Sequence, residues 1–245
     1  MSRTVYITDS TETAYYAAVF RAWRQNEAYI TSAKNFQPQL TDEIVAVSKT
    51  EETAAEEARR VSTALFKIDA QAPAEIRRIL SSGNIQKEQI AYLYMKEIFR
   101  YRTPAREKTY LNAVRAATDV IHQIGKELEH LKGFLRFKET TNGILYAACA
   151  PDNDILISLA PHFIRRLASP FVLHDVSRGY AVCYNGETVL RIEAEEATIP
   201  VSATEEEIAA LWASYFKNVA IRARTNKKQQ DNLMPRRYRK FMPET

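Results

Sequence analysis

Glycine is scarce in this chain, with six in 245 residues, and the phosphate-binding signatures GxxxxGK[ST] and GxGxxG are both missing. Architectures in which a glycine-rich loop cradles phosphates are therefore disfavoured. Cysteine is scarcer still. Cys149 and Cys183 lie far apart, each in an apolar run typical of a strand, so we expect buried free thiols rather than a disulfide. No CxxC metal spacing occurs, and two cysteines cannot supply an all-cysteine set for an iron–sulfur cluster.

Long apolar runs are also lacking. No stretch approaches the roughly 18 apolar residues that mark a membrane-spanning helix. Residues 1–7 do not contain the apolar core of a targeting segment. The sequence therefore predicts a cytoplasmic protein in a reducing compartment, with no membrane among its partners. A hydrophobic content of 46% and a charged content of 26% are ordinary for a globular protein.

What the chain does have is positive charge concentrated at one end. Between Lys217 and Thr245, nine lysines and arginines are opposed only by Asp231 and Glu244. Since the whole chain carries a net charge of +4, the residues before this segment are net acidic. Aromatic residues are interleaved with these cations, a combination that suits a polyanion such as nucleic acid. The structural alternative is a solvated tail rich in lysine and arginine.

Helical periodicity dominates the first half of the chain. Apolar residues recur every three or four positions in several segments, which predicts helices over 12–23, 51–66, 73–83, 85–101 and 111–131. A capping box formed by Asp9 and Glu12 is expected to open the first of these helices. Gly133 is expected to end the last one. Short strands are predicted at 5–7 and 44–47.

After Gly133 the apolar period changes to two. Asn142-Gly143 separates the strand-like runs 134–139 and 144–149, and Asn185-Gly186 separates 180–184 from 188–192. Asn-Gly between two such runs predicts a β-hairpin. A further strand is predicted at 171–176, a final helix opens near residue 202, and a helix at 155–167 contains Pro161, which should kink or restart it.

These patterns predict an α+β protein. We expect a small antiparallel sheet of about five strands, built from two Asn-Gly hairpins and surrounded by helices, with a helical N-terminal half and a basic helical C-terminus. Residues 1–245 are expected to form a single compact domain. If it is subdivided, the expected parts are 1–132, mainly helical, and 133–245.

The basic positions outline a candidate nucleic-acid site. Arg136 is expected in the first hairpin strand, semi-buried and paired with a phosphate or with a carboxylate such as Asp175. Tyr146, Tyr184 and Tyr238 are candidate stacking surfaces, although each of these aromatic residues also fits a core position. The residues predicted to line one phosphate-binding groove are Arg136, His162, Arg165, Arg166, Arg178, Arg222, Arg224, Lys227, Lys228, Arg236, Arg237 and Tyr238.

The four histidines do not form a recognisable catalytic or metal-binding motif. His122 and His130 are eight residues apart, no HExxH sequence is present, and no cysteine is placed to join them. His174 and Asp175 are neighbours in a strand, so their side chains point to opposite faces and do not readily form an acid–base pair. The sequence therefore predicts no metal site and no cofactor.

Several motifs resemble those of one bacterial family. They are Leu135-Arg136-Phe137-Lys138, Leu145-Tyr146-Ala147, Pro161-His162-Phe163 with Arg165-Arg166, Asp175 with Arg178, and the ending Met234-Pro235-Arg236-Arg237-Tyr238 through Pro243-Glu244. This chain resembles the family described as putative DNA-metabolism proteins linked to a radical SAM protein. A similar domain of unknown function occurs fused to uracil-DNA glycosylases. That family usually has tryptophan where Arg239 stands here. The resemblance implies a role in DNA repair or modification and a radical SAM partner, and it supplies no catalytic residues.

Three hypotheses follow. The first is an accessory nucleic-acid-binding protein of DNA repair or modification that acts with a radical SAM enzyme. The second is an enzyme acting on a nucleobase or phosphodiester, which would need a pocket that gathers His130, His162 or His174 with a carboxylate. The third is a protein-docking module without a nucleic-acid ligand. The sequence assigns no catalytic residue and therefore favours a role without a reaction of its own.

Overall fold

The computed structural model of this protein describes residues 3–25, 27–194, 205, 208 and 236–242. Their contacts divide the chain into two compact units, Met1–Ile124 and Gly125–Thr245, with the boundary inside helix α5. These are called the first unit and the second unit below. Within the described residues, no helix combines the length and the apolar character needed to cross a membrane.

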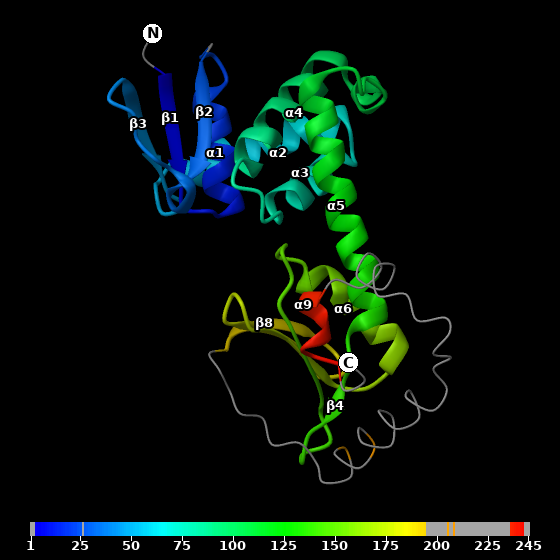
Figure 1. Cartoon of the computed structure of the whole chain (residues 1–245). Coiled ribbons are helices and arrows are strands. Elements are labelled where there is room, and N and C mark those ends of the chain that lie inside the picture. Colours follow the sequence, from blue (N-terminus) through cyan, green and yellow to red (C-terminus); the bar gives the residue numbers. More distant parts are fainter. Residues whose placement is uncertain (1–2, 26, 195–204, 206–207, 209–235, 243–245) are drawn as a thin grey trace. The chain divides into compact units, whose positions relative to one another are not determined.

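The first unit contains a three-stranded parallel sheet (Figure 1). Its strands are β1 (Arg3–Thr8), β2 (Ala28–Ser32) and β3 (Asp42–Val47), in the order β2-β1-β3. Val5 in the central strand pairs with Tyr29 of β2 and Ile44 of β3. Helix α1 (Glu12–Ala22) makes the crossover from β1 to β2 that a parallel pair requires. The N-terminal half is therefore not simply helical, and β2 was missed because its sequence, Ala-Tyr-Ile-Thr-Ser, has little period-two contrast.

Thr11 caps helix α1, in place of the expected capping box of Asp9 and Glu12. The Thr11 side chain accepts a hydrogen bond from the backbone N–H of Ala14 at 3.2 Å. The Asp9 carboxylate instead accepts from the hydroxyl of Thr11 (2.5 Å), the hydroxyl of Ser48 (3.1 Å) and the backbone N–H of Lys49 (3.0 Å). Asp9 therefore joins the segments that follow β1 and β3.

The helices of the first unit each bury an apolar face. They are α2 (Ala54–Ile68), α3 (Ala72–Leu80), α4 (Lys87–Tyr101) and the start of α5 (Asn112–Phe134), with 3-10 turns at η1 (Ala33–Asn35) and η2 (Thr103–Glu107). Their positions agree with the helical periodicity of the sequence. α4 lies along β2, where the side chain of Gln89 accepts a hydrogen bond from the backbone N–H of Ile30 at 2.9 Å.

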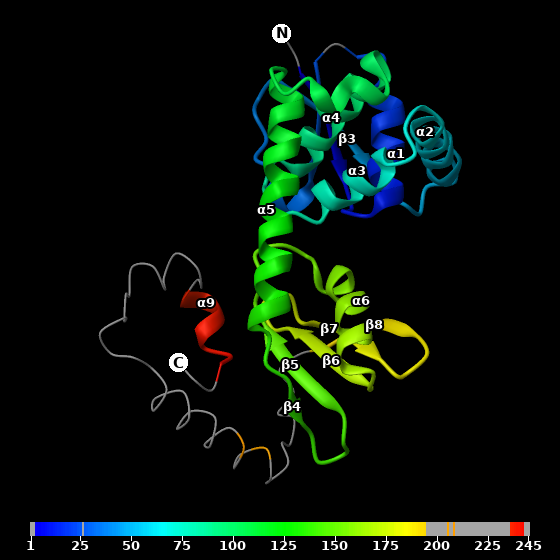
Figure 2. The same ribbon diagram turned by 90° about the vertical axis from the view of Figure 1, so that its right-hand side faces the viewer.

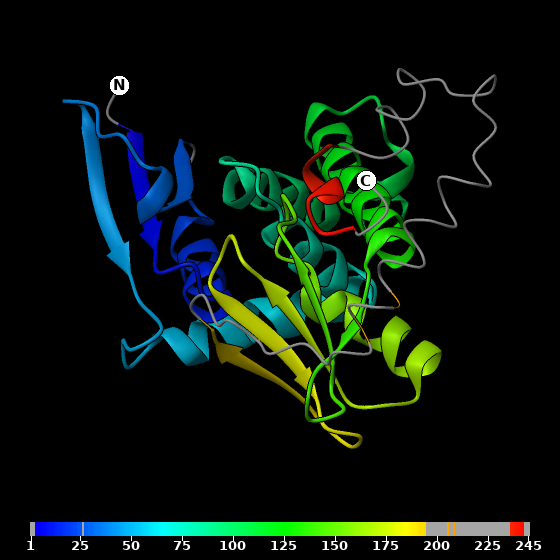
Figure 3. The same cartoon turned by 60° about the horizontal axis from the view of Figure 1, so that its bottom comes forward.

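The second unit contains a five-stranded mixed sheet in the order β4-β5-β6-β7-β8. Its strands are β4 (Lys138–Glu139), β5 (Leu145–Cys149), β6 (Phe171–Asp175), β7 (Tyr180–Tyr184) and β8 (Val189–Glu193). Both Asn-Gly hairpins are present, with antiparallel β4–β5 and β7–β8 pairs. The second hairpin forms the yellow end of the sheet in Figure 3.

The prediction of a purely antiparallel sheet was wrong, because β5 and β6 pair in parallel. Helix α6 (Leu156–Leu167) connects them and returns the chain to the end at which β5 began (Figure 2). α6 continues through Pro161 rather than restarting there. Because proline has no N–H, the carbonyl of Ile157, four residues earlier, receives no helical hydrogen bond. Ile157 is 52% exposed, so water can donate a hydrogen bond to this carbonyl instead.

The first hairpin strand is shorter than predicted. α5 runs through Gly133 to Phe134, and the backbone N–H of Leu135 still bonds to the carbonyl of Leu131 at 3.1 Å. Arg136 therefore follows a helix and does not lie in a strand. Regular β pairing begins only at Lys138.

The core of the second unit lies between α6 and the sheet. Phe163 of α6 and Phe171 of β6 are fully buried, and Phe137 packs edge-on against both rings, with centroid distances of 4.9 and 6.0 Å. Both cysteines are free, Cys149 buried and Cys183 half-buried. The short helix α9 (Arg236–Arg239) is the last described element.

Candidate functional site

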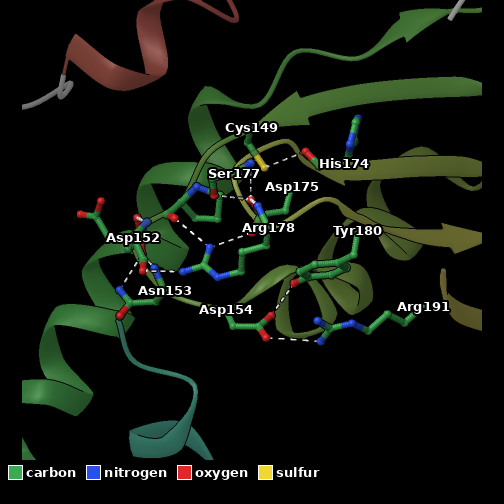
Figure 4. A network of polar contacts seen from close by, with 12 residues as sticks. Cys149, Asp152, Asn153, Asp154, His174, Asp175, Ser177, Arg178, Tyr180 and Arg191 are labelled. Atoms are coloured by element: carbon green, nitrogen blue, oxygen red, sulfur yellow. Dashed lines mark hydrogen bonds and ion pairs between the residues drawn. The ribbon is translucent and has the colours of Figure 1, made fainter. Parts of the chain in front are cut away.

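An ion pair with a fully buried carboxylate occupies the carboxyl ends of β5 and β6. Asp175, the last residue of β6, is completely buried, and Arg178 donates to its carboxylate at 2.7 Å. The same carboxylate accepts from the backbone N–H and the hydroxyl of Ser177, at 3.0 and 2.6 Å. Arg178 also donates to the carbonyls of Pro151 and Asp152, at 2.9 and 2.6 Å (Figure 4). One guanidinium therefore ties the loop after β5 to the turn after β6.

Glu127 of α5 holds this loop by further hydrogen bonds. Its carboxylate accepts from the backbone N–H of Asp152 (2.8 Å) and from the backbone and side-chain amides of Asn153 (3.0 and 2.6 Å). The hydroxyl of Tyr238 donates a fourth bond at 2.7 Å. Burial acts to raise the pKa of Glu127, but the bonds from Asp152, Tyr238 and Asn153 outweigh it and lower that pKa. Glu127 is therefore a buried carboxylate that stays ionised.

A second polar contact extends this network along the sheet edge. The hydroxyl of Tyr180 donates to one oxygen of Asp154, and Arg191 donates to the other at 3.3 Å (Figure 4). The guanidinium of Arg191 also lies over the Tyr180 ring, 3.7 Å from its centroid. Asp154 therefore fixes the start of α6 to the β7–β8 hairpin.

Cys149 and His174 are not arranged for nucleophilic catalysis. Burial, followed by the nearby charges of Asp175 and Glu127, raises the pKa of the Cys149 thiol far above its ordinary range. A protonated thiol is a poor nucleophile. His174 is 4% exposed, and its Nε2 lies 3.2 Å from the carbonyl of Ala194, so Nε2 is the donor. The other ring nitrogen, Nδ1, lies 2.7 Å from the Tyr146 hydroxyl.

A cluster of cations lies where α5 ends beside α6. Arg136 donates to the carbonyl of Gly133 at 2.8 Å, and Arg166 donates to the carbonyl of Lys132 at 3.1 Å. The two guanidiniums thus bind consecutive carbonyls at the negative end of the α5 helix dipole. The guanidinium of Arg166 has five N–H donors, and the carbonyl of Lys132 accepts from one of its nitrogens.

His162 adds a titratable ring to this cluster. Burial lowers the pKa of His162, and the neighbouring charges of Lys132, Arg166 and Arg165 lower it further. Its Nε2 is buried and has no hydrogen-bond partner among the described residues. We call Lys132, Arg136, His162, Arg165 and Arg166 the α5–α6 cation cluster. Burial and the positive charges around it therefore favour the neutral form of this histidine.

Residues 85–244 match the family described as a domain of unknown function, DUF4130. The chain belongs to the DUF4130 family. No curated protein and no solved structure matches it. The DUF4130 segment contains the whole polar network of the second unit and the α5–α6 cation cluster.

The structure separates the predicted site residues that it describes into three groups. Arg136, His162, Arg165 and Arg166 come together in the cation cluster. Arg178 and Tyr238 instead make the internal contacts described above, and Tyr238 is only 2% exposed. Arg236 is exposed on α9, which also contains Arg237. Arg222, Arg224, Lys227 and Lys228 lie outside the described residues.

The histidines occupy separate positions in the DUF4130 segment. His130 packs on Phe134 with ring centroids 5.7 Å apart, His162 packs on Phe163, and His174 is bonded within the sheet. Among the described residues, no group of three or more histidines, cysteines or carboxylates could hold a metal ion. In this part of the chain the hypothesis of a shared histidine–carboxylate pocket finds no support.

Sequence reasoning missed Glu127, the centre of the loop network. A signal was present, because Glu127 falls three residues after buried Ile124 and four before buried Leu131, within the apolar stripe of α5. A carboxylate at such a position predicts a buried acceptor with backbone partners. Its partners, Asp152 and Asn153, are about 25 residues away in sequence, and no pattern in the sequence indicates that they contact Glu127.

Proposed function

We propose that this protein is an accessory nucleic-acid-binding protein of DNA repair or modification that acts with a radical SAM partner enzyme. The observation that supports it best is the α5–α6 cation cluster. Arg165 and Arg166 are exposed there, next to a histidine whose pKa is lowered by burial and by the charges of Lys132, Arg166 and Arg165. Phosphate groups on a nucleic-acid backbone are the anions that such a cluster suits.

The C-terminal basic residues Arg222, Arg224, Lys227, Lys228, Arg236 and Arg237 are proposed to contact further phosphates. The roles in DNA repair or modification and the radical SAM partner come from the resemblance of the chain to a family of DNA-metabolism proteins. Copurification of the tagged protein with an identified radical SAM protein tests the partner directly. Without nucleic-acid binding, such copurification would favour the protein-docking hypothesis instead.

The first experiment is fluorescence anisotropy with labelled single- and double-stranded DNA at several salt concentrations. Binding should weaken steeply with salt, and Arg165→Gln and Arg166→Gln should each lower the magnitude of the salt slope by about one. Arg78→Gln is the matched control, because Arg78 is an exposed cation of α3 far from this cluster in sequence. Absence of binding at low salt would refute the proposed function.

His162 provides a second and independent test. An anion beside the ring would raise its pKa, so binding should be accompanied by proton uptake. Affinity should therefore increase as the pH falls through the ordinary histidine range, and this increase should be smaller in His162→Gln. An unchanged pH profile in the variant would show that nucleic acid does not contact the α5–α6 cation cluster.

A further inference from the structure

The first unit contains a large groove that the polar network does not explain. Its volume is about 820 Å³, and it lies among α1, α2 and the C-terminal part of α4. The aromatic residues that line it are Phe20 at the end of α1, Trp23 just after α1, and Phe99 of α4. We call it the α1–α2–α4 groove. Only its α4 side lies within the DUF4130 segment.

Aromatic rings remain partly accessible in this groove. Phe20, Trp23 and Phe99 are all half-buried, and Trp23 packs edge-on against Phe99 with ring centroids 4.7 Å apart. Trp23 and Phe99 also line a second hollow of about 490 Å³, together with Lys96, Glu97 and Arg100. The rings of Trp23 and Phe99 therefore line both hollows.

The charge that lines the α1–α2–α4 groove is of one sign. Its described lining includes Arg21, Arg24, Arg59, Arg60 and Lys67 but no carboxylate. Two of these charges are neutralised by partners outside the lining. Arg21 forms ion pairs with Glu51 and Glu57, both at 2.9 Å, and Arg59 pairs with Glu56 at 2.8 Å.

The remaining three cations are available to a ligand. Arg24, Arg60 and Lys67 are exposed and form no ion pair with any described residue. The guanidinium of Arg60 lies over the Phe20 ring, 4.8 Å from its centroid, so this cation and an aromatic surface already adjoin. Lys67 lies in the last turn of α2 and Arg24 follows α1, where a cation also offsets the negative end of a helix dipole.

We infer that the α1–α2–α4 groove binds single-stranded nucleic acid, with a base against Trp23 and phosphates beside Arg24, Arg60 and Lys67. Accessible aromatic rings combined with a cationic groove are the chemistry that recognises unpaired bases and their backbone. In a duplex the bases are stacked and paired, so their faces cannot reach Trp23. This inference rests on the proposed nucleic-acid function and assigns a site separate from the α5–α6 cation cluster.

Tryptophan fluorescence of the full chain can report on the groove directly. The chain has two tryptophans, so Trp212→Phe leaves Trp23 as the single reporter. Titration with unlabelled oligothymidylate should quench this fluorescence in a saturable, salt-dependent manner. A duplex of equal length should cause little quenching, because its bases are not free to stack.

Substitutions in the groove test the contacts separately. The triple variant Arg24→Gln, Arg60→Gln and Lys67→Gln should lower the magnitude of the single-strand salt slope by about two, since each phosphate contact contributes roughly 0.7. Trp23→Leu should weaken binding about tenfold, whereas Trp23→Phe, which retains a ring, should weaken it less. The charge-matched control is Lys34→Gln, Lys49→Gln and Arg78→Gln, three exposed cations of the same unit that do not line the groove.

The outcomes distinguish this inference from the proposed function. If the groove variants bind oligothymidylate like their control while Arg165→Gln or Arg166→Gln binds it more weakly, the groove inference is wrong and the proposed function stands. If the unaltered protein binds no nucleic acid, both fail. If Arg24 and Lys67 serve only the helix dipoles and Arg60 only covers Phe20, the triple variant will lose thermal stability and keep its affinity, which also overturns the inference.

Discussion

Removing the Arg178 guanidinium should destabilise the second unit strongly. Arg178→Ala would leave the fully buried carboxylate of Asp175 without its ion-pair partner and would free the carbonyls of Pro151 and Asp152. Removing one partner of a fully buried ion pair costs about 3–5 kcal/mol, whereas the Arg178 side chain is 28% exposed. Asp175 would keep its bonds to Ser177 and to the backbone N–H of residue 178, at 3.2 Å. We therefore expect a loss near the lower limit, about 3 kcal/mol.

Urea denaturation followed by far-ultraviolet circular dichroism measures this loss. Arg59→Ala is the matched control, because Arg59 pairs with Glu56 at the same three-residue spacing, but both side chains are more than half exposed. That exposed pair should contribute no more than about 0.5 kcal/mol. If Arg178→Ala and Arg59→Ala lowered the free energy of unfolding equally, the reasoning that burial makes the Asp175 pair important would be refuted.

Three further perturbations have outcomes fixed by local structure. Hydrogen bonds from neighbouring groups outweigh the effect of burial and lower the pKa of Asp9 to about 2. The stability that ionised Asp9 provides is therefore present above the pKa of the unfolded state and is lost as the pH falls through 2. In thermal melts, the difference in stability between the unaltered protein and Asp9→Asn should shrink between pH 5 and pH 2. Gly179 has a φ of +66°, whereas Gly125 lies inside α5 with no neighbouring atom within 4 Å of an added Cβ. In urea denaturation, Gly179→Ala should lower the free energy of unfolding by about 1 kcal/mol and Gly125→Ala should raise it by about as much. Changes of the same sign in the two variants would contradict this reasoning. Chemical denaturation should show that Phe163→Ala lowers the free energy of unfolding by about 3–5 kcal/mol, because this ring is fully buried. Phe66 is 58% exposed, so Phe66→Ala should lower it by less than about 0.5 kcal/mol.

Local signals in the sequence predicted much of the fold. The hairpin at Asn185-Gly186 forms as expected, with Tyr184 of β7 paired with Val189 of β8. The error at Gly133 has a local cause as well. This glycine faces open space and the backbone bond of Leu135 satisfies the carbonyl of Leu131, so the helix continues past it.

Parallel pairings could not be predicted in the same way. β1 pairs with β2 and β3, and β5 pairs with β6, only after intervening segments bring together strands that are distant in sequence. In the candidate site, too, individual residues could be recognised from the sequence but their partners could not. Arg178 and Asp175 were both singled out, yet Asp175 was considered as a partner of Arg136 rather than of the arginine three residues later. The cations of the α1–α2–α4 groove come from helices whose association has no signature in the sequence.

The start of the DUF4130 match has a consequence for shorter forms of this protein. The match begins at residue 85, just before α4, yet α4 buries Tyr92, Met95 and Ile98 inside the first unit. The hydroxyl of Tyr92 also donates to the carbonyl of Ala22 at 3.1 Å. A protein cut at the family boundary would expose this apolar stripe to water, and self-association is the usual result of such exposure. Residues 3–84 therefore shield the apolar face of α4, the amino-terminal helix of the DUF4130 segment, from water.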